Sequence, residues 1–213
     1  MASEKQPTRR KILVLLRKRG SMTAAELARS LGLTAMGVRR HLHTLLGDGL
    51  VEYRRVQHGV GRPRFAYSLT RLADDLFPKN YPALTNELLG YLEALDGEGK
   101  VNLLFQRRGE RRLRAARERL AGKDLGEQVA ELARILDEEG YLAEWEQQGE
   151  DTWFIREHNC AVRQVAERYR QACGSELEFL QAALPEAEVT RVHHLVAGDE
   201  HCGYRIRRRA RED

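Results

Sequence analysis

Two short amphipathic segments joined by a glycine constrain the fold of this chain more than any other feature. The first, TAAELARSLGL (residues 23–33), begins with a T-x-x-E capping box and ends at Gly32. The second, TAMGVRRHLHTLLGDGL (residues 34–50), begins at the helix-capping Thr34 and repeats apolar residues at helical spacing. Its predicted buried stripe consists of Val38, Leu42 and Leu45. Two short helices joined by a tight turn form a helix-turn-helix motif.

The 3.6-residue period turns the remaining residues of the second helix largely away from that stripe. In a helix-turn-helix, the second helix enters the major groove of DNA with its N-terminal residues on the base edges. The predicted DNA-contacting residues of this helix are Thr34, Ala35, Met36, Arg39, Arg40 and His43. Arg39 and Arg40 are the best candidates for base or phosphate contacts. The alternative is that these arginines are only solvated surface residues.

A basic β-hairpin is expected to follow the two helices. LVEYRRV and RFAYSLT alternate apolar and polar residues, and QHGVGRP between them contains two glycines and a proline. Arg62 and Arg64 lie at the predicted tip, where they would contact phosphates or a minor groove. The sequence therefore predicts a winged helix-turn-helix.

The distribution of charge supports a division into two domains. Residues 1–77 carry fifteen basic and six acidic residues, a net charge of +9. Residues 78–213 carry 21 basic and 26 acidic residues, a net charge of −5. This asymmetry indicates a nucleic-acid-binding domain (1–77) followed by a dimerisation and sensor domain (78–213).

Other function classes find little support in the sequence. No apolar run approaches the roughly 18 residues of a membrane helix, and the N-terminus lacks the apolar core of a secretory signal. We therefore expect a cytoplasmic protein without membrane contact. The chain also lacks a phosphate-binding Gly-Lys loop, H-E-x-x-H and G-x-S-x-G, so an enzyme is not expected.

The middle of the chain contains a predicted linker and a predicted dimerisation helix. FPKNYP (residues 77–82) has two prolines and no apolar period. A heptad-like seam follows, formed by Tyr81, Leu84, Leu88, Tyr91 and Leu95. It could pack inside the second domain or against a second subunit. Since palindromic operators are bound by symmetric pairs of such domains, we expect a homodimer on double-stranded DNA.

The stretch RRGERRLRAARERL (residues 107–120) contains seven arginines. It predicts a helix with Leu113, Ala116 and Leu120 inward and solvated Arg/Glu pairs outward. A second nucleic-acid patch is the alternative. A clear amphipathic helix follows, with Leu125, Val129, Leu132 and Leu136 as its stripe and Gly140 as its stop.

The C-terminal part is expected to form two hairpins with helices between them. Residues 141–160 predict two strands turning at Gly149, and residues 189–207 predict a second hairpin turning at Gly198–Asp199. The sequence pattern of residues 161–184 predicts a helix with a break at Gly174. The predicted fold class is α+β and mostly helical: an N-terminal winged helix-turn-helix plus a C-terminal α+β sensor domain with a small antiparallel sheet.

The three cysteines raise the question of a metal centre. If residues 160–173 formed one straight helix, Cys160 and Cys173 would stand about 20 Å apart on different faces. They could bind one centre only if the helix began after Cys160 and the chain bent. Cys160 and Cys202, at or in strands, form a more plausible pair.

Several stretches together resemble one known family. GLTAMGVRRHLHTLLGDGLV, GRPRFAYSLT, NCAVRQVAERYRQAC and HLVAGDEHCGYRI resemble the SufR-like regulators over nearly the full length. These are winged-helix repressors of iron–sulfur cluster biosynthesis within the broader ArsR/DeoR-type regulators. Cys160, Cys173 and Cys202 match three of the family's four signature cysteines in register, and Ala187 occupies the third position.

The resemblance implies a [4Fe–4S] cluster that reports cluster supply or oxidative stress and changes operator affinity. Cysteine thiolates are the normal ligands of such clusters, here Cys160, Cys173 and Cys202. The nearby candidates for a completing ligand are Glu186, Glu188, His194 and His201.

Three alternatives to the cluster remain open at this stage. The cysteines could be buried core residues, in which case a small-molecule effector would control a regulator without a cluster. Zinc could bind Cys160 and Cys202 with one histidine, namely His158, His194 or His201. A redox thiol switch is the third. In each case the expected function is a transcriptional regulator, a repressor, in which the effector shifts the population of DNA-binding conformations.

Overall fold

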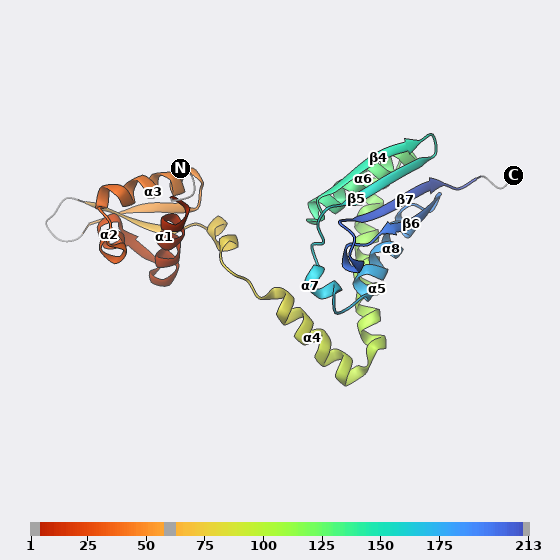
Figure 1. Cartoon of the computed structure of the whole chain (residues 1–213), viewed down its shortest axis with the longest axis horizontal. Helices are drawn as coiled ribbons and strands as arrows, with labels where there is room; N and C mark the ends of the chain where they lie inside the picture. Colours follow the sequence, from red (N-terminus) through yellow and green to blue (C-terminus); the bar gives the residue numbers. More distant parts are fainter. Residues whose placement is uncertain (1–4, 58–62, 211–213) are drawn as a thin grey trace. The chain divides into compact units, whose positions relative to one another are not determined.

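The computed structural model describes residues 5–57 and 63–210. The chain forms two compact units, Met1–Lys79 and Asn80–Asp213, and the predicted domain boundary at residue 77 falls close to this division (Figure 1). The predicted fold class, α+β and mostly helical with small antiparallel sheets, is confirmed. None of the described helices combines the length and apolarity needed to cross a bilayer.

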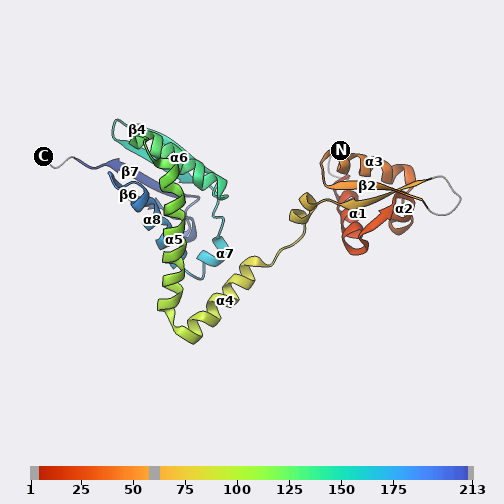
Figure 2. The ribbon, with the colours of Figure 1, turned by 180° about the vertical axis from the view of Figure 1, so that it is seen from behind.

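The N-terminal unit combines three helices with a three-stranded antiparallel sheet of order β1-β3-β2 (Figure 2). The helices are α1 (Lys5–Arg19), α2 (Ala24–Leu31) and α3 (Ala35–Gly47). The strands are β1 (Ser21–Thr23), β2 (Val51–Val56) and β3 (Arg64–Leu69), followed by the 3₁₀ helix η1 (Arg71–Leu76). The short strand β1 was not predicted, because three residues are too few to display an alternating pattern.

Local capping signals explain the helix-turn-helix. The hydroxyl of Thr23 accepts a hydrogen bond from the backbone N–H of Glu26, and the Glu26 carboxylate accepts one from the Thr23 N–H at 2.7 Å. Gly32 ends α2 with a φ of +66°, a left-handed conformation that favours glycine. The predicted stripe of α3 is buried against α1 and α2, which is confirmed for Val38, Leu42 and Leu45.

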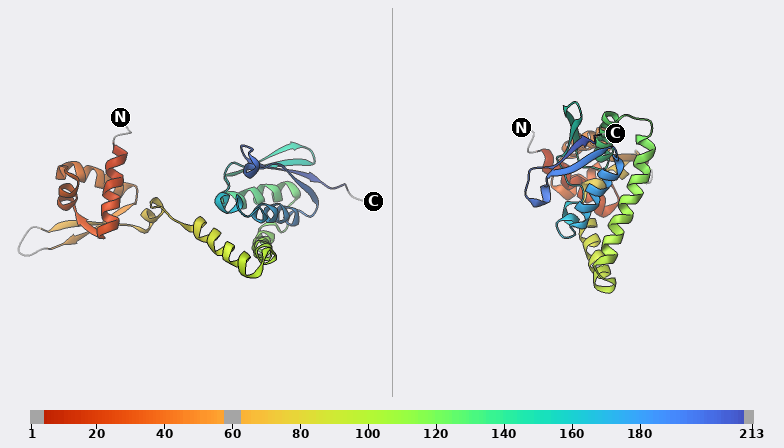
Figure 3. Two further views of the ribbon diagram at one scale, coloured as in Figure 1. Left: turned by 60° about the horizontal axis from the view of Figure 1, so that its bottom comes forward. Right: turned by 90° about the vertical axis from the view of Figure 1, so that its right-hand side faces the viewer.

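The C-terminal unit places α6 and α8 on one face of a four-stranded antiparallel sheet of order β4-β5-β7-β6 (Figure 3). The strands are β4 (Ala143–Gly149), β5 (Thr152–Glu157), β6 (Ala187–His193) and β7 (Cys202–Arg208). The helices are α4 (Tyr81–Asp96), α5 (Glu98–Leu120), α6 (Leu125–Glu138), α7 (Arg163–Ala166), α8 (Gln171–Ala183) and the 3₁₀ helix η2 (Leu195–Ala197). Both predicted hairpins are confirmed, and the stripe of α6 lies in the core.

The arginine-rich helix α5 differs from expectation at one position. Ala116 and Leu120 are buried and Leu113 packs beside them, as predicted. Arg112, however, is buried rather than solvated. Its guanidinium donates two hydrogen bonds of 3.0 Å to Glu176 and also bonds Glu139. A buried arginine requires such paired carboxylates, and they come from distant parts of the chain.

The helix expected after Cys160 is broken at a different place from the predicted one. The chain turns through residues 167–170, between α7 and α8, and continues as a helix through Gly174. Residues 160–173 therefore do not form one straight helix. This bend changes where Cys173 lies.

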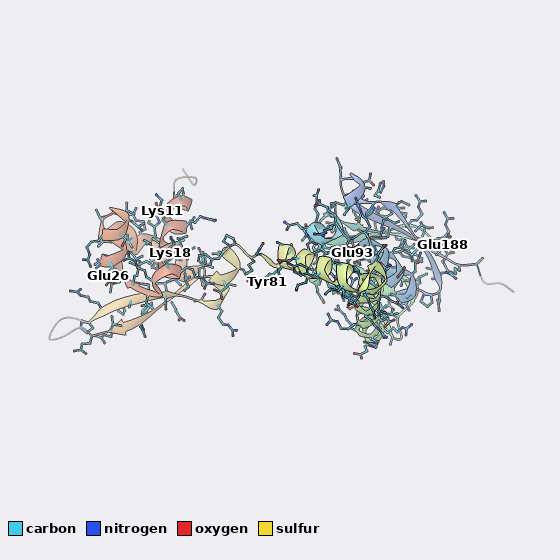
Figure 4. The ribbon with its side chains drawn as sticks, turned by 90° about the horizontal axis from the view of Figure 1, so that it is seen from below. Lys11, Lys18, Glu26, Tyr81, Glu93 and Glu188 are labelled. Atoms are coloured by element: carbon cyan, nitrogen blue, oxygen red, sulfur yellow. The ribbon has the colours of Figure 1, made fainter. Side chains whose placement is uncertain are left out.

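Helix α4 packs on its own unit through one polar face. The Asn86 side chain donates to the backbone oxygen of Gln164 in α7 at 2.9 Å, and the Tyr169 hydroxyl bonds Glu93 at 3.5 Å. No residue of α4 is buried. Figure 4 labels Tyr81 at the start of α4 and Glu93 in its second half. The heptad-like seam lies on the opposite side of the helix, because its residues are half a turn away from Asn86 and Glu93.

Candidate functional site

The exposed face of α3 is the first candidate site. Thr34 caps the helix, with its hydroxyl accepting from the Gly37 N–H at 3.1 Å. The other residues predicted to contact DNA lie along the outer side of the helix: Met36, Arg39, Arg40 and His43 are exposed, and Ala35 is partly buried. Within the described residues, neither Arg39 nor Arg40 forms an ion pair, so both guanidinium groups can bind phosphate or a base edge.

The wing lies beside this helix in the same unit. Burial raises the pKa of Tyr67 on β3, and the charge of Arg39 opposes that shift, which places the two side chains within electrostatic range. Arg64 is exposed at the start of β3, opposite Val56 of β2. Arg62 lies outside the described residues. Arg39 of α3 and Arg64 of the wing are thus exposed basic groups of the same unit.

Two further arginines on the wing were missed by the sequence analysis. Arg54 and Arg55 of β2 are exposed and pair in register with Ala66 and Phe65. The signal was present in VEYRRV, where two adjacent arginines in one strand project to opposite faces. Whichever face meets DNA therefore carries one of them.

The second candidate site is a pocket that all three cysteines line. Cys160, Cys173 and Cys202 share this pocket with His194 and with three buried or partly buried charged residues, namely Glu157, Glu176 and Arg191. Cys202 is buried, and Cys160 and Cys173 are partly buried. All three are free thiols. We call this set of residues the cysteine pocket.

Sheet register explains why the cysteines meet. Glu157 at the end of β5 pairs with Cys202 at the start of β7, and Cys160 follows β5 by three residues. The end of β6 reaches the same edge, because His193 pairs with Gly203. His194 therefore begins its loop beside Cys202. The expected pairing of Cys160 with Cys202 fits this register.

Cys173 joins the other two because of the bend before α8. It lies in the first turn of α8, and its backbone oxygen accepts a hydrogen bond from the guanidinium of Arg191 on β6. The expectation that Cys173 would point elsewhere followed from the straight-helix assumption and is wrong. The bend required for Cys160 and Cys173 to converge is present.

The pocket suppresses ionisation of the free thiols. Burial raises the pKa of Cys160 and Cys173, and it raises the pKa of Cys202 to about 11. The Arg191 charge opposes this shift at Cys173 and Cys202. The Leu195 N–H also donates to the Cys202 Sγ at 3.4 Å. A nearby positive charge such as Arg191 and an N–H donor such as that of Leu195 stabilise a thiolate once a cation is bound.

Three buried polar atoms in the pocket have no hydrogen-bond partner among the described residues: His194 Nε2, Glu157 Oε1 and Arg191 Nε. Such atoms are costly when buried, because they lose water without gaining another partner. Burial, aided by Arg191 and Arg170, lowers the pKa of His194 and favours its neutral form. His194 is one of several candidate ligands in the sequence, where no local signal distinguishes it from the others.

Ala187 does not reach this pocket. It is a core residue at the start of β6 and pairs with Arg208 at the far end of β7. His193, at the pocket end of β6, is six residues away, which corresponds to about 20 Å along a strand. The third position of the family's cysteine signature therefore does not face the cysteine pocket in this chain.

The pocket is narrow and does not form a ready-made site for a single ion. About 20 Å³ is open to the centre of a water molecule, enough for about one water. Among the residues that the structure describes, no three His, Cys, Asp or Glu side chains stand close enough to hold one metal ion. Of the histidines considered for zinc, His194 lines the pocket, whereas His158 lies outside it, 3.3 Å from Glu144.

The N-terminal unit is similar to a known protein family. Residues 6–53, from α1 into β2, match the family model for bacterial regulatory proteins of the arsR family. None of the curated proteins matches the chain at a significant level. The match covers less than half of the chain and leaves the cysteine pocket outside it.

Several solved structures are similar at low identity. A transcriptional regulator homologue from Pyrococcus horikoshii OT3 has 23% identity and a TM-score of 0.29, covering 42% of this chain and 84% of that chain. RV1404 from Mycobacterium tuberculosis has 23% identity and a TM-score of 0.29, covering 49% and 72%. Bacillus subtilis PadR, solved with operator DNA, has 18% identity and a TM-score of 0.28, covering 61% and 90%.

These TM-scores are too low to establish a shared whole-chain fold. The N-terminal domain is therefore identified from the family match alone. It is a match to regulatory proteins, in agreement with the expectation that the chain is not an enzyme. The N-terminal domain is an ArsR-type winged helix-turn-helix, and the chain is a DNA-binding transcriptional regulator.

Proposed function

We propose that this regulator is a repressor whose operator affinity is controlled by a [4Fe–4S] cluster in the cysteine pocket. The observation that carries the proposal is the convergence of Cys160, Cys173 and Cys202 on one end of the C-terminal sheet. The proposal places the protein in the cytoplasm, together with its DNA.

The residues fit such a cluster by the chemistry of their donors. Thiolates are its usual ligands, and each binds a different iron, so the sulfurs need not be as close as around one ion. The buried and unpartnered His194 Nε2 adds a donor, and Arg191 offsets negative charge. The free volume is smaller than a cluster. We infer that the loop Leu195–His201, exposed at residues 198–200, moves outward on binding.

When bound, the cluster would supply a group whose assembly or loss depends on iron, sulfide and oxidants. The chain's own residues then determine what the change does. Cys160 and Cys173 flank α7, and α7 accepts the hydrogen bond from Asn86 of α4. A shift of α7 is therefore passed directly to α4.

We propose that α4 is the dimerisation helix. Its seam residues are all exposed, from 50% at Leu84 to 82% at Leu95, and the helix contacts its own unit through the opposite face. An apolar stripe with a spacing of 3 and 4 residues is suited to a second copy of the same helix. A symmetric pair of winged helices would match a palindromic operator. Repacking of α4 would then change how the two domains meet DNA.

On DNA, the proposal assigns base or phosphate contacts to the outer side of α3 and phosphate contacts to the wing. The base-reading candidates are Thr34, Ala35, Met36, Arg39, Arg40 and His43. We assign contacts with the DNA backbone to Arg64 and to the exposed Arg54 and Arg55 of β2, and Arg62 is a candidate from the sequence. A small-molecule effector in the cysteine pocket would require a larger opening still, because organic ligands occupy cavities of about 300–1,000 Å³.

The proposal is tested with protein purified without oxygen and, in parallel, reconstituted with ferrous iron and sulfide. We expect close to four iron and four sulfide per chain, with broad visible absorbance. A variant with all three cysteines changed to serine should contain neither. Protein that stays colourless and free of iron after reconstitution would contradict the cluster and redirect the search to other effectors.

A further inference from the structure

The three cysteines leave one position of a four-ligand cluster unassigned. The described residues that line the pocket with an unpartnered, buried ligand-type atom are His194 and Glu157. Position 187, the signature position that departs from the family, lies at the other end of the sheet. The completing ligand must therefore come from another part of the chain.

We propose that His194, through Nε2, is the fourth ligand, so that the centre is held by three cysteines and one histidine. This inference rests on the proposed function and deepens it. His194 is the first residue after β6, and the backbone register places it next to the start of β7 and thus beside Cys202. Its Nε2 is buried in the pocket without a partner.

The loop around His194 is built to hold the backbone while leaving the ring nitrogen unused. The His194 N–H donates to Asp199 at 2.6 Å, and the Ala197 and Asp199 N–H groups both donate to the His194 backbone oxygen. The loop is thus anchored on its own backbone. The imidazole contributes nothing to these bonds through Nε2, so metal binding would not require breaking them.

Glu157 is the competing donor and fits less well. It is the last residue of β5, between β4 and β7, where pairing with Ala143 and Cys202 holds its backbone in the sheet. One of its oxygens already accepts a hydrogen bond from the Tyr204 hydroxyl at 3.5 Å. His194 stands on a loop that can follow an incoming cluster, whereas Glu157 can approach one only if the sheet itself moves.

The other neighbouring histidines differ from His194 in position. His193 is exposed, and its ring lies tilted against that of His201 with centroids 4.9 Å apart. His201 also neighbours His158 at 6.2 Å. This group lies next to the cysteine pocket but does not line it. His193→Ala is therefore a matched control, because it removes an imidazole one residue away from the proposed ligand.

The test compares the full-length wild-type chain with His194→Ala, His194→Cys, Glu157→Gln and the His193→Ala control, all reconstituted with ferrous iron and sulfide without oxygen. The direct readout is pulsed electron paramagnetic resonance of the reduced cluster, which detects a nitrogen bound to iron. We expect a strong nitrogen coupling in wild type, Glu157→Gln and His193→Ala. It should be absent in His194→Ala and His194→Cys.

Cluster retention gives a second readout. His194→Ala should lose its cluster to a chelator at least about tenfold faster than wild type, since loss of even an outer-shell partner costs 10–100-fold in affinity. His194→Cys should restore retention with a shifted reduction potential. A variant Ala187→Cys combined with His194→Ala should not restore it, because position 187 is on the far end of the sheet.

The outcomes separate the two proposals. If wild type takes up no cluster, the proposed function fails and the ligand assignment fails with it. If wild type is loaded and His194→Ala retains its cluster and its nitrogen coupling, only the assignment of His194 is overturned. Loss of retention in Glu157→Gln, with His194→Ala unaffected, would assign the position to Glu157 instead.

Discussion

Replacement of Arg112 by methionine tests the buried network that supports the cysteine pocket. The Arg112 guanidinium donates two hydrogen bonds of 3.0 Å to Glu176 and lies 4.2 Å from the ring centroid of Phe179. Glu176 is only 5% exposed and also accepts from the Tyr141 hydroxyl at 3.0 Å. Methionine keeps the aliphatic packing but removes the cation, so Glu176 would remain as an uncompensated buried charge.

Breaking a buried pair in this way costs about 3–5 kcal/mol. Glu157 strengthens the effect, because its pKa is already raised by burial and by the charge of Glu176, and Arg112 opposes that shift. With a urea m-value of about 2 kcal/mol/M, a loss of about 4 kcal/mol lowers the unfolding midpoint by about 2 M.

The assay is urea unfolding of the metal-free protein, followed by tryptophan fluorescence. Both tryptophans, Trp145 and Trp153, lie in the C-terminal unit, so the signal reports this unit alone. Arg107→Met is the matched control, since Arg107 pairs with Glu110 at the surface, where such pairs contribute about 0–1 kcal/mol.

A double variant separates the charge from the packing. Arg112→Met combined with Glu176→Gln removes both charges and leaves an acceptor for the Tyr141 hydroxyl. It should lose at least about 1 kcal/mol less than the sum of the two single losses, because neighbouring charges couple. An Arg112→Met midpoint equal to that of Arg107→Met would refute the reasoning.

Three further predictions concern DNA binding, assembly and coupling. Changing Arg39 and Arg40 together to alanine should weaken operator binding at least about thirtyfold, because each contact contributes about 1–3 kcal/mol. Arg64→Ala should reduce the dependence of log affinity on log salt concentration by about one. Fluorescence anisotropy over a salt series measures both effects. Leu88→Asp should convert the dimer to a monomer at micromolar concentration, as measured by light scattering, because it places a charge in the apolar seam. Asn86→Ala should retain the cluster and the dimer but reduce the cluster's effect on operator affinity, measured as the ratio of dissociation constants.

Each of these has a matched control. Arg111→Ala with Arg114→Ala removes two exposed charges from α5 and should leave DNA binding unchanged; a loss there would revive the second nucleic-acid patch. Ala83→Asp adds a charge to α4 away from the seam and should leave the dimer intact. An Asn86→Ala protein with the wild-type ratio would remove α7 from the route between the pocket and α4.

The winged helix could be predicted from the sequence because its signals are local. The capping box at Thr23, the left-handed Gly32 and the stripe through Val38 each depend on residues within a few positions. The same holds for α6 and for both C-terminal hairpins. The three-residue β1 was missed because its place in the sheet is set by pairing with β3, far along the chain.

The features of the cysteine pocket depend on tertiary contacts and could not be predicted in the same way. Nothing in the sequence at residues 167–170 marks the bend that brings Cys173 to Cys160, since the stretch contains no glycine or proline. Arg112 is one of several similar arginines in α5. Only the fold, which places Glu176 against it from 64 residues away, distinguishes it from its solvated neighbours.

The residues that face the cysteine pocket could not be predicted from cysteine spacing either. Matching cysteine spacings along the sequence suggested position 187 as the missing ligand, whereas the antiparallel pairing of β6 and β7 carries that position away from Cys202. The same pairing returns His194 to the pocket. Spacing along the chain therefore indicates a resemblance but does not show which residues share a site.

The most direct test of the account is the operator affinity of one preparation with and without its cluster. An operator would be selected from a random DNA pool, and binding would be measured at fixed salt before and after removal of iron by a chelator without oxygen. The account predicts a change in the dissociation constant of about 5–150-fold, the usual range of coupling between sites. Equal affinities for loaded and stripped protein, with iron content verified in the same samples, would contradict control by the cysteine pocket.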